Sequence, residues 1–361
     1  MTSPSVFSTR EYQHGDANAI NNLYCRVTGR NRSEGEYEWQ WILPPAGQGS
    51  IYLIHAKSDE NVDPLLIGHH GIIPLRFSDN NYIGIAGKTE NTMVDPAYRN
   101  KILYPRYESR FKAQYSNKYD VLFSTMGPPA AIKQRRVHGY IEVGTWEIFT
   151  LSTRRALIKT TLKPYARISQ SFNLVPLTKA SLERYDFTSF WNSCKSEYPF
   201  TSSREKIDLE WRFLRNPYHS YLIAVLEDNF FPSGIGGFAI IRLPSKGKPM
   251  AMIEDIVSCN PSPSAFQFLL GKVLCSLFKK GILYATLPFV LDNSSQSHCL
   301  YMGAAIYASR LNEFRRFIGN IARRQECAGR KHGMMRWVSP NTKMSSAIDQ
   351  WYITGIVFEG R

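Results

Sequence analysis

Hydrophobic and polar positions alternate through much of the first half of the chain, and this pattern predicts a helix followed by a meander of strands. The runs at 65–76 and 82–94 are extended and joined by a turn, so they predict a hairpin. After residue 96 the apolar spacing changes from two to about 3.6, which predicts helices between the later strands. The predicted elements are a helix at 18–27, strands at 51–55, 65–76 and 82–94, a helix at 103–116, a strand at 121–123, a helix at 128–137 and a strand from 139.

The second half of the chain repeats this order in a looser form. Its predicted elements are helices at 180–196 and 264–279, a helix that ends at 211–216, and strands at 221–227, 234–243, 250–258 and 283–287. The repetition predicts a boundary between residues 149 and 175. We therefore expect two tandem α+β domains, residues 1–150 and 151–361.

The composition is that of a globular protein. Of 361 residues, 43% are hydrophobic and 20% charged, which is enough to bury one or two cores. No apolar run approaches the roughly 18 residues that cross a bilayer, and the opening residues are polar, so we expect a soluble, cytoplasmic protein. The six cysteines lie far apart, which predicts free thiols, and no set of His, Cys, Asp or Glu has the spacing of a metal site.

Positive charge is concentrated in the second half. Lys and Arg number 44 against 30 Asp and Glu, a net charge of +14; residues 1–150 hold 16 basic and 15 acidic side chains, and residues 151–361 hold 28 and 15. Such an excess predicts a phosphate-bearing partner. The densest run, from Arg310 to Arg336, has apolar residues at helical spacing. It predicts a basic amphipathic helix, which could be packed with a solvated face, grip phosphate or contact an anionic membrane.

One segment, from Glu90 to Tyr104, is more specific than the others. Its sequence is Glu-Asn-Thr-Met-Val-Asp-Pro-Ala-Tyr-Arg-Asn-Lys-Ile-Leu-Tyr. It resembles the central motif of the GCN5-related N-acetyltransferase superfamily, in which a strand ending in Val-x-Pro-x-Tyr-Arg leads into a turn. The resemblance covers most of residues 8–150. It implies tandem domains of this fold, each a mixed, mostly antiparallel twisted sheet flanked by helices.

The resemblance also implies a binding site for acyl-CoA, used as a co-substrate, not as a permanently bound cofactor. Backbone N–H groups at the start of a helix attract anions, so the turn would hold the pyrophosphate of coenzyme A. The implied coenzyme-binding residues are Thr92, Met93, Val94, Arg99, Asn100, Lys101, Ile102, Leu103 and Tyr104. The sequence departs from the family, which usually has glycines where this chain has Ile102 and Tyr104. Arg135 stands where many members place a tyrosine that protonates the leaving thiol.

The second half resembles the same fold more weakly, through the segment from Trp211 to Pro217 and a Trp-Tyr-Ile-Thr-Gly run at 351–355. Tandem members of this kind include enzymes that acylate the amino group of nucleotide-linked sugars for surface polysaccharides. The resemblance therefore implies an acyl-CoA-dependent N-acyltransferase whose second domain shapes the acceptor pocket. Trp211 and Arg212 could stack on a base and pair with a phosphate, although a Trp at a helix end is also a common core residue.

Three residues are candidates for the base that deprotonates the amine. Glu90 shares one strand face with Lys88, so it could act as a base or simply form an ion pair with that lysine. His69 and His70 point to opposite faces of one strand, and a histidine titrates in a useful range. Either histidine could equally be a structural residue.

Two other functions fit parts of the sequence. A degenerate transferase domain could belong to a non-catalytic protein that binds an anionic surface or nucleic acid, but no nucleic-acid motif is present, and we expect no nucleic-acid partner. An aminoacyl transferase acting on a cell-wall precursor would use the same basic surface, but such proteins often carry a long helical arm, which the pattern does not predict. The sequence does not specify the sugar, the nucleotide, the acyl chain or the oligomeric state.

Overall fold

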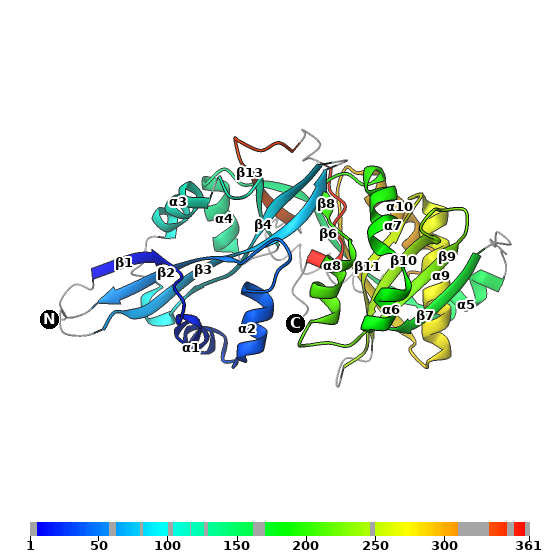
Figure 1. The fold of residues 1–361 in the computed structure, drawn as a ribbon, viewed down its shortest axis with the longest axis horizontal. Helices are drawn as coiled ribbons and strands as arrows, with labels where there is room; N and C mark the ends of the chain where they lie inside the picture. The colour runs from blue at the N-terminus through cyan, green and yellow to red at the C-terminus, as the bar shows by residue number, and fades with distance from the viewer. Residues whose placement is uncertain are drawn as a thin grey trace, which may run out of the picture. The chain divides into compact units, whose positions relative to one another are not determined.

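A computed structural model describes residues 6–57, 63–79, 82–99, 104–115, 117–125, 129–161, 170–245, 250–309, 332–344 and 350–357. The chain forms two compact units (Figure 1). Unit 1 comprises residues 1–76, 84–141 and 335–343, and unit 2 comprises residues 77–83, 142–334 and 344–361. Each unit is described by itself below.

Unit 1 is a sheet with helices on both faces. Its strands lie in the order β1-β2-β3-β4-β5-β13, in which the β4–β5 pair is parallel and the β1–β2, β2–β3 and β5–β13 pairs are antiparallel. Its elements are β1 (Val6–Glu11), α1 (Ala17–Thr28), α2 (Glu34–Trp41), β2 (Ser50–Lys57), β3 (Leu65–Asp79), β4 (Tyr82–Val94), η1 (Pro96–Tyr98), α3 (Tyr104–Tyr115), β5 (Val121–Ser124), α4 (Pro129–Val137) and β13 (His332–Val338).

Alternation along β3 places different helices on the two faces of this sheet. His69 packs edge-on against Trp41 of α2, with ring centroids 5.4 Å apart. The next residue, His70, stacks on Phe111 of α3 at 3.6 Å. Helix α2 begins at the capping box of Ser33, whose side chain accepts from the N–H of Glu36. Helices α2 and α3 therefore pack on opposite faces of the sheet at strand β3.

Unit 2 repeats the arrangement of a mostly antiparallel sheet with one parallel pair. Its strands lie in the order β6-β12-β11-β10-β9-β7, and only β11–β12 is parallel. The elements are β6 (Ile141–Ser152), α5 (Thr153–Thr161), β7 (Gln170–Pro176), α6 (Lys179–Arg184), α7 (Phe187–Cys194), η2 (Lys195–Glu197), β8 (Thr201–Ser202), α8 (Lys206–Leu209), η3 (Glu210–Leu214), β9 (Tyr221–Asp228), β10 (Ile235–Arg242), β11 (Ala251–Ser258), α9 (Pro263–Lys279), β12 (Tyr284–Leu291), α10 (Ser295–Ala305) and η5 (Gly355–Val357).

The core of unit 2 lies on both faces of β10. Phe238 contacts Phe187 and Phe190 of α7. On the other face, a Cβ added to Gly237 would lie 3.3 Å from Leu269 of α9, so this glycine lets the helix approach the sheet closely. Helix α9 begins at Ser262, which accepts from the N–H of Ala265, with Pro263 in its first turn.

The structure confirms the predicted fold class and most predicted elements, and it corrects two. The helix predicted at 180–196 is two helices, because Tyr185 is extended and Asp186 caps a new helix by accepting from the N–H of Ser189. The helix predicted to end at 211–216 ends at Leu214, and its last turn is the π-helical turn η3. The helical spacing of the basic run lies within residues 310–331, which are outside the described residues, so the basic helix stays a prediction; the end of the run, 332–336, forms part of strand β13.

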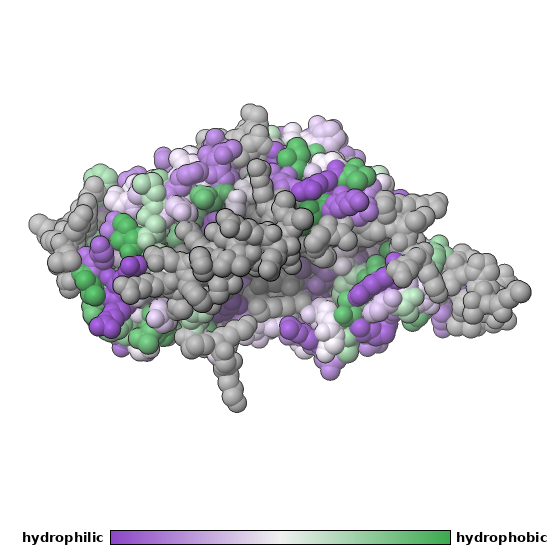
Figure 2. Space-filling model, turned by 180° about the vertical axis from the view of Figure 1, so that it is seen from behind, coloured by the Kyte–Doolittle hydropathy of each residue, from purple (hydrophilic) through white to green (hydrophobic). Residues whose placement is uncertain are grey.

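Exposed apolar side chains are scattered over the described surface. Val137, Phe230 and Met302 are exposed, but they lie on α4, on the β9–β10 turn and on α10. In Figure 2, hydrophobic residues lie among hydrophilic ones over the described part of the face shown. Within the described residues, no helix combines the length and the apolar character needed to cross a bilayer.

Candidate active site

The candidate site of unit 1 lies where strands β4 and β5 stop pairing. Their parallel ladder covers three residue pairs and ends at Lys88 and Phe123. Strand β4 continues to Val94, whereas β5 ends at Ser124. The last residues of β4 therefore run beyond the ladder, and Thr92 among them is exposed.

The backbone of strand β4 is left-handed at Asn91, in this stretch beyond the ladder, and this irregularity is called the kink below. Asn91 has φ = 49°, the only positive φ of a non-glycine residue in the described part of the chain. Such a conformation costs roughly 1–3 kcal/mol and persists only where surrounding contacts impose it. His69 Nδ1 lies 2.8 Å from the Asn91 carbonyl oxygen, and the Asn91 side chain donates to Gln40 Oε1 at 3.4 Å. The kink is therefore held by neighbouring strand β3 and helix α2.

Gln40 is itself fixed in the interior of unit 1. It is 1% exposed, and Arg32 donates to its Oε1 from Nη1 at 3.1 Å. Arg32 in turn donates from Nε to Asn21 of α1 at 2.8 Å. A chain of polar contacts thus connects α1 to the kink in β4.

Arg135 of α4 bridges the two strands where they stop pairing. Its Nη2 donates to Thr89 Oγ1 on β4 at 3.2 Å, and its Nη1 donates to Ser124 Oγ on β5. The side chain is buried. A guanidinium is a permanent cation, so it can stabilise negative charge that develops nearby but does not supply a proton as a phenol would.

Glu90 lies beside the kink and forms an ion pair with Lys88, which is one of the two roles that the sequence predicts for it. Its Oε2 lies 2.7 Å from the ammonium of Lys88, which is 2% exposed, and its Oε1 accepts from the N–H of Asn91 at 3.4 Å. The carboxylate therefore also supports the kink. Its assignment as a base stays a prediction.

His69 and His70 lie on opposite faces of β3, as the sequence predicted, and both are buried. Burial lowers the pKa of His69 to about 3, although the contact with the Asn91 carbonyl opposes the shift. Burial also lowers the pKa of His70 to about 4, against the attraction of Glu108, whose Oε2 lies 3.6 Å away. Both imidazoles are therefore neutral at pH 7. Their role as bases stays a prediction.

The turn that follows β4 is fixed at its start. The Asp95 carboxylate accepts from the N–H of Ala97 at 3.1 Å and pairs with Arg26 of α1 at 2.8 Å. Arg99 is exposed and donates from Nε to the Val94 carbonyl at 3.2 Å. Asn100, Lys101, Ile102 and Leu103 lie outside the described residues, and α3 begins at Tyr104. The contribution of this turn to coenzyme binding stays a prediction.

Unit 2 provides an internal comparison for the end of β4. The β11–β12 ladder ends at Met252 and Thr286, so Glu254 lies two residues beyond it, as Glu90 does in unit 1. Residues 351–357, called the C-terminal strap below, contact both strands there. Ile353 accepts from the N–H of Val290 on β12 at 2.9 Å. Thr354 donates to Asp255 on β11 at 2.6 Å.

The C-terminal strap therefore fills the end of the β11–β12 ladder in unit 2. The seven strap residues are buried, and an added Cβ on Gly355 would lie 2.7 Å from the Glu254 carbonyl oxygen. Glu254 lies beneath the strap, and burial raises its pKa to about 7 despite the opposing attraction of Arg242 and Arg212. A ligand could occupy this place only if the strap were displaced.

The two predicted acceptor residues lie in the interior of unit 2. Trp211 is 6% exposed and Arg212 8% exposed, and both belong to the π-helical turn η3. Arg212 acts on the buried Glu254, whose pKa its charge lowers. Contact of either residue with an acceptor stays a prediction.

The fold is similar to that of solved GCN5-related N-acetyltransferases. A structure from Enterococcus faecalis V583, described as a conserved protein of unknown function and probable N-acyltransferase, matches with a TM-score of 0.62 at 10% identity, covering 93% of this chain and 73% of that one. GCN5-related N-acetyltransferases from Anabaena variabilis ATCC 29413 and Kribbella flavida match with TM-scores of 0.57 and 0.53 at 13% and 11% identity. They cover 81% and 82% of this chain, and 68% and 67% of those chains.

The similarity is one of structure, because no protein-family model matches the sequence and no curated protein matches it. At these identities the comparison establishes the fold.

Sequence reasoning missed two residues that shape the site. The pattern predicts an ordinary strand residue at Asn91, and nothing in it indicates a positive φ at this position. Gln40 gave no clear signal, because neighbouring residues of a helix point in different directions, so the tryptophans on either side do not predict that it is buried. Buried polar side chains of this kind require partners, and one of the two partners here, Asn91, is 51 positions away along the chain.

Proposed function

We propose that unit 1 transfers an acyl group from acyl-CoA to a primary amine at the kinked end of β4. The observation that carries the proposal is the contrast between the units. The same position beyond a short parallel ladder is filled by the C-terminal strap in unit 2, whereas in unit 1 it leads to the exposed Thr92. A strained residue at this point, Asn91, is consistent with a functional constraint.

The residues of unit 1 suit the chemistry of acyl transfer. The amine nitrogen attacks the thioester carbonyl, the C–S bond breaks, and the amine proton must be removed while the sulfur leaves as thiolate or thiol. Backbone N–H groups of residues 92–94 would stabilise the carbonyl oxygen as it becomes negative. Glu90 would accept the amine proton directly or through water. The cation of Arg135 would stabilise the thiolate, so no tyrosine would be needed there.

The proposed coenzyme-binding residues are Thr92, Met93, Val94, Arg99, Asn100, Lys101, Ile102, Leu103 and Tyr104. The structural match to GCN5-related N-acetyltransferases supports an acyl-CoA co-substrate. For the acceptor, we propose the amino group of a nucleotide-linked amino sugar. The support is the positive charge of residues 151–361, which contain 28 basic and 15 acidic residues and so suit a ligand with a negatively charged diphosphate. Unit 2 would then contribute to acceptor binding.

Calorimetric titration with coenzyme A and acetyl-CoA tests the coenzyme site. We expect one ligand per chain for the wild type and binding weakened at least tenfold in Arg99→Glu. The matched control is Arg110→Glu, since Arg110 is an exposed arginine of the same unit on α3. Equal weakening by both charge reversals would assign the effect to general electrostatics. Absence of binding at millimolar coenzyme would refute the proposal and favour a non-catalytic role for the basic half.

Release of free thiol from acetyl-CoA tests the reaction itself. We expect release only when an amine acceptor is also present, with nucleotide-linked amino sugars faster than free amino sugars. Glu90→Gln should lower kcat and leave coenzyme affinity unchanged, because the proton acceptor is lost but the binding surface is not. Lys88→Met is the companion variant, since it removes the ion pair and keeps the carboxylate. If Glu90→Gln and Lys88→Met lower kcat alike, Glu90 has only a structural role.

A further inference from the structure

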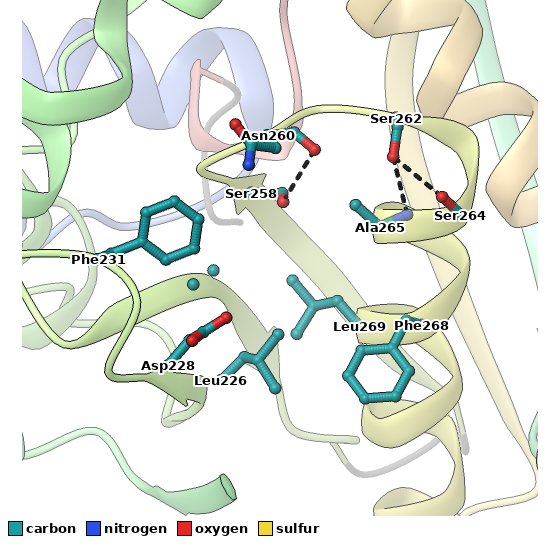
Figure 3. Close-up of a pocket in the computed structure, with 12 residues that line it drawn as sticks. Leu226, Asp228, Phe231, Ser258, Asn260, Ser262, Ser264, Ala265, Phe268 and Leu269 are labelled. Atoms are coloured by element: carbon teal, nitrogen blue, oxygen red, sulfur yellow. Dashed lines mark hydrogen bonds between the residues drawn. The ribbon is translucent and has the colours of Figure 1, made fainter. Parts of the chain in front are cut away.

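Two hollows outside the candidate active site indicate no particular ligand. The one in unit 2 has a volume of about 380 Å³, and leucine and phenylalanine side chains line much of it (Figure 3). Its acidic residue, Asp228, is 1% exposed and already accepts from the N–H of Phe230 at 3.0 Å, whereas the start of α9 on the other side favours anions. The hollow in unit 1, beside α1, is lined by charges of both signs that pair with one another, such as Arg10 with Asp16. The opposed charges therefore select neither a cation nor an anion, and the kink in β4 is more informative.

His69 of β3 forms the shortest contact with the kink. Its Nδ1 lies 2.8 Å from the Asn91 carbonyl oxygen. A carbonyl oxygen can only accept, so Nδ1 carries the proton of the neutral imidazole and donates it. The other ring nitrogen, Nε2, is buried and has no hydrogen-bond partner within the part of the chain that the structure describes. A base has to lie within hydrogen-bond reach of the proton that it removes, and a buried Nε2 is out of reach of an amine.

The ring of His69 is itself held in place by packing. It stands edge-on against Trp41 of α2, with ring centroids 5.4 Å apart, and the residue is 1% exposed. Gly71, two residues further along the same face of β3, makes room for both rings. An added Cβ on Gly71 would overlap the Trp41 ring and lie 2.9 Å from His69 Cε1. The imidazole therefore has little freedom to turn its Nδ1 away from Asn91.

The hydrogen bond from His69 also determines the direction of the Thr92 N–H. The described residues contain no cis peptide bond, so the Asn91 carbonyl and the Thr92 N–H belong to one planar trans peptide and point in opposite directions. Because the imidazole holds the carbonyl oxygen, this peptide directs the Thr92 N–H away from His69. An ordinary strand residue at position 91 has a negative φ, which would turn the peptide differently. The hydrogen bond and the φ of 49° therefore set this direction together.

Asparagine suits this backbone conformation and adds a second contact. Asn is one of the few residue types with a side chain that adopts a left-handed backbone readily, whereas a β-branched residue there is strained. The Asn91 side chain donates to Gln40 Oε1 at 3.4 Å, a longer bond than the one from His69. Thr92, the next residue, is exposed and lies beyond the end of the β4–β5 ladder. A backbone donor of fixed direction is therefore present at an exposed residue of the candidate site.

From these contacts we infer that His69 is a positioning residue for the proposed acyl transfer, a role that rests on the proposed function. His69 holds the Asn91 peptide so that the Thr92 N–H meets the thioester carbonyl oxygen as that oxygen becomes negative. The amine nitrogen bonds to the carbonyl carbon, the C–S bond breaks, the sulfur leaves as thiolate and the amine proton goes to Glu90. His69 exchanges no proton in these steps.

Steady-state kinetics of thiol release from acetyl-CoA by the full chain, with UDP-glucosamine as the amine, test this role. We expect His69→Leu to lower kcat about 10- to 100-fold, because the peptide is no longer held and one donor to the carbonyl oxygen is misplaced. His69→Asn keeps an N–H donor near the position of Nδ1 and cannot act as a base, so its kcat should stay within about threefold of wild type. Calorimetric affinity for coenzyme A should be unchanged in both variants, since coenzyme A lacks the acyl carbonyl.

Substitutions at Asn91 test the same peptide from its other side. Asn91→Gly permits the positive φ and should keep kcat within about threefold of wild type, whereas Asn91→Val disfavours it and should lower kcat about as far as His69→Leu does. Both losses concern one N–H, so the double variant His69→Leu, Asn91→Val should be within about twofold of the slower single variant, whereas independent effects would multiply. The control is His55→Leu, which replaces a buried histidine of the neighbouring strand β2 and should leave kcat unchanged.

Several outcomes would overturn the positioning role. They are an unchanged kcat in His69→Leu, equal losses in His69→Asn and His69→Leu, which would show that the imidazole acts as a base, and a fall in coenzyme A affinity that matches the fall in kcat. Should either His69 variant fail to fold in a thermal melt, the Asn91 variants decide, and equal kcat values for Asn91→Gly and Asn91→Val would overturn the role. A wild type that releases no thiol refutes the proposed function and this role with it, whereas an active wild type with an equally active His69→Leu refutes the role alone.

Discussion

Replacing Glu254 by Gln tests the electrostatics beneath the C-terminal strap, where strands β11 and β12 of unit 2 stop pairing. The Glu254 side chain is 6% exposed, and its Oε1 lies 3.0 Å from Arg242 Nε. An ion pair of this kind would favour the charged carboxylate, and so would the nearby Arg212. Burial is the larger effect, and it raises the pKa from an ordinary 4.5 to about 7. We therefore expect the protonated carboxyl group to be the form that the fold prefers.

The direction of the pH dependence follows from this raised pKa. Between pH 4.5 and 7 the folded protein holds a proton on Glu254 that the unfolded chain has released. Stability from this group is therefore fully present below about pH 4.5 and is lost as the pH rises through 7. The full effect is about 3 kcal/mol, of which roughly 2.5 kcal/mol falls between pH 5 and pH 8. Gln cannot ionise, so Glu254→Gln removes this dependence.

Urea unfolding of both proteins at pH 5, 6, 7 and 8, followed by circular dichroism, measures the effect. We expect the free energy of unfolding of Glu254→Gln, relative to wild type, to increase by roughly 2.5 kcal/mol from pH 5 to pH 8. Other titrating groups, including the two histidines of β3, are common to both proteins and cancel in the difference. A constant difference would refute the raised pKa. A variant that is least stable relative to wild type at pH 8 would show that the arginines outweigh burial.

Three further predictions concern other buried groups. Burial lowers the pKa of His69 to about 3, so the free energy of unfolding decreases as the pH falls below 6.5. At pH 5, measured by urea unfolding, wild type should have lost about 2 kcal/mol more than His69→Gln. Arg204 pairs through two nitrogens with Asp255, and both side chains are fully buried. Arg204→Met should therefore lower the free energy of unfolding by about 3–5 kcal/mol, and the double variant Arg204→Met, Asp255→Leu should recover most of this loss. A double variant no more stable than the single one would contradict this. Gly355→Ala would force the strap away from the Glu254 carbonyl, costing about 1–3 kcal/mol and accelerating proteolysis at the C-terminus, and an unchanged cleavage rate would argue against close packing there.

Much of the fold could be predicted because its elements carry local signals. The strands β9, β10 and β11 are runs of β-branched and apolar residues between turns, and their observed bounds differ from the predicted ones by one residue at most. The strand β1 was missed because it lies in a polar lead-in and is stabilised by pairing with β2. Strand β13 was missed for a similar reason, since it pairs with β5 from more than 200 residues away in the chain. Such pairings override local propensity.

Less of the candidate site could be predicted, because its geometry depends on contacts between distant segments. The motif after β4 was visible in the sequence from Val94 to Arg99. The kink at Asn91 depends on Gln40 and His69, which belong to other elements. The depressed pKa of His69 likewise follows from burial against Trp41, and sequence alone gives it an ordinary titration range.

The two units share a short sequence signature whose variation separates their roles. Glu38-Trp39-Gln40-Trp41 in unit 1 corresponds to Glu210-Trp211-Arg212-Phe213 in unit 2, and each precedes the first long strand of the unit's meander. The third position is buried in both. In unit 1 it is Gln40, a neutral group that holds the kink through Asn91.

In unit 2 the third position is Arg212, whose charge acts on Glu254 beneath the C-terminal strap. A neutral amide at this position can position a backbone kink without attracting the neighbouring acid. A cation there attracts the ionised acid, although burial beneath the C-terminal strap has the larger effect on Glu254. The charge at this buried position therefore differs between unit 1, where Thr92 beyond the ladder is exposed, and unit 2, where the C-terminal strap is buried at the corresponding place. This difference supports our proposal that acyl transfer takes place in unit 1, where Gln40 holds the backbone at Asn91.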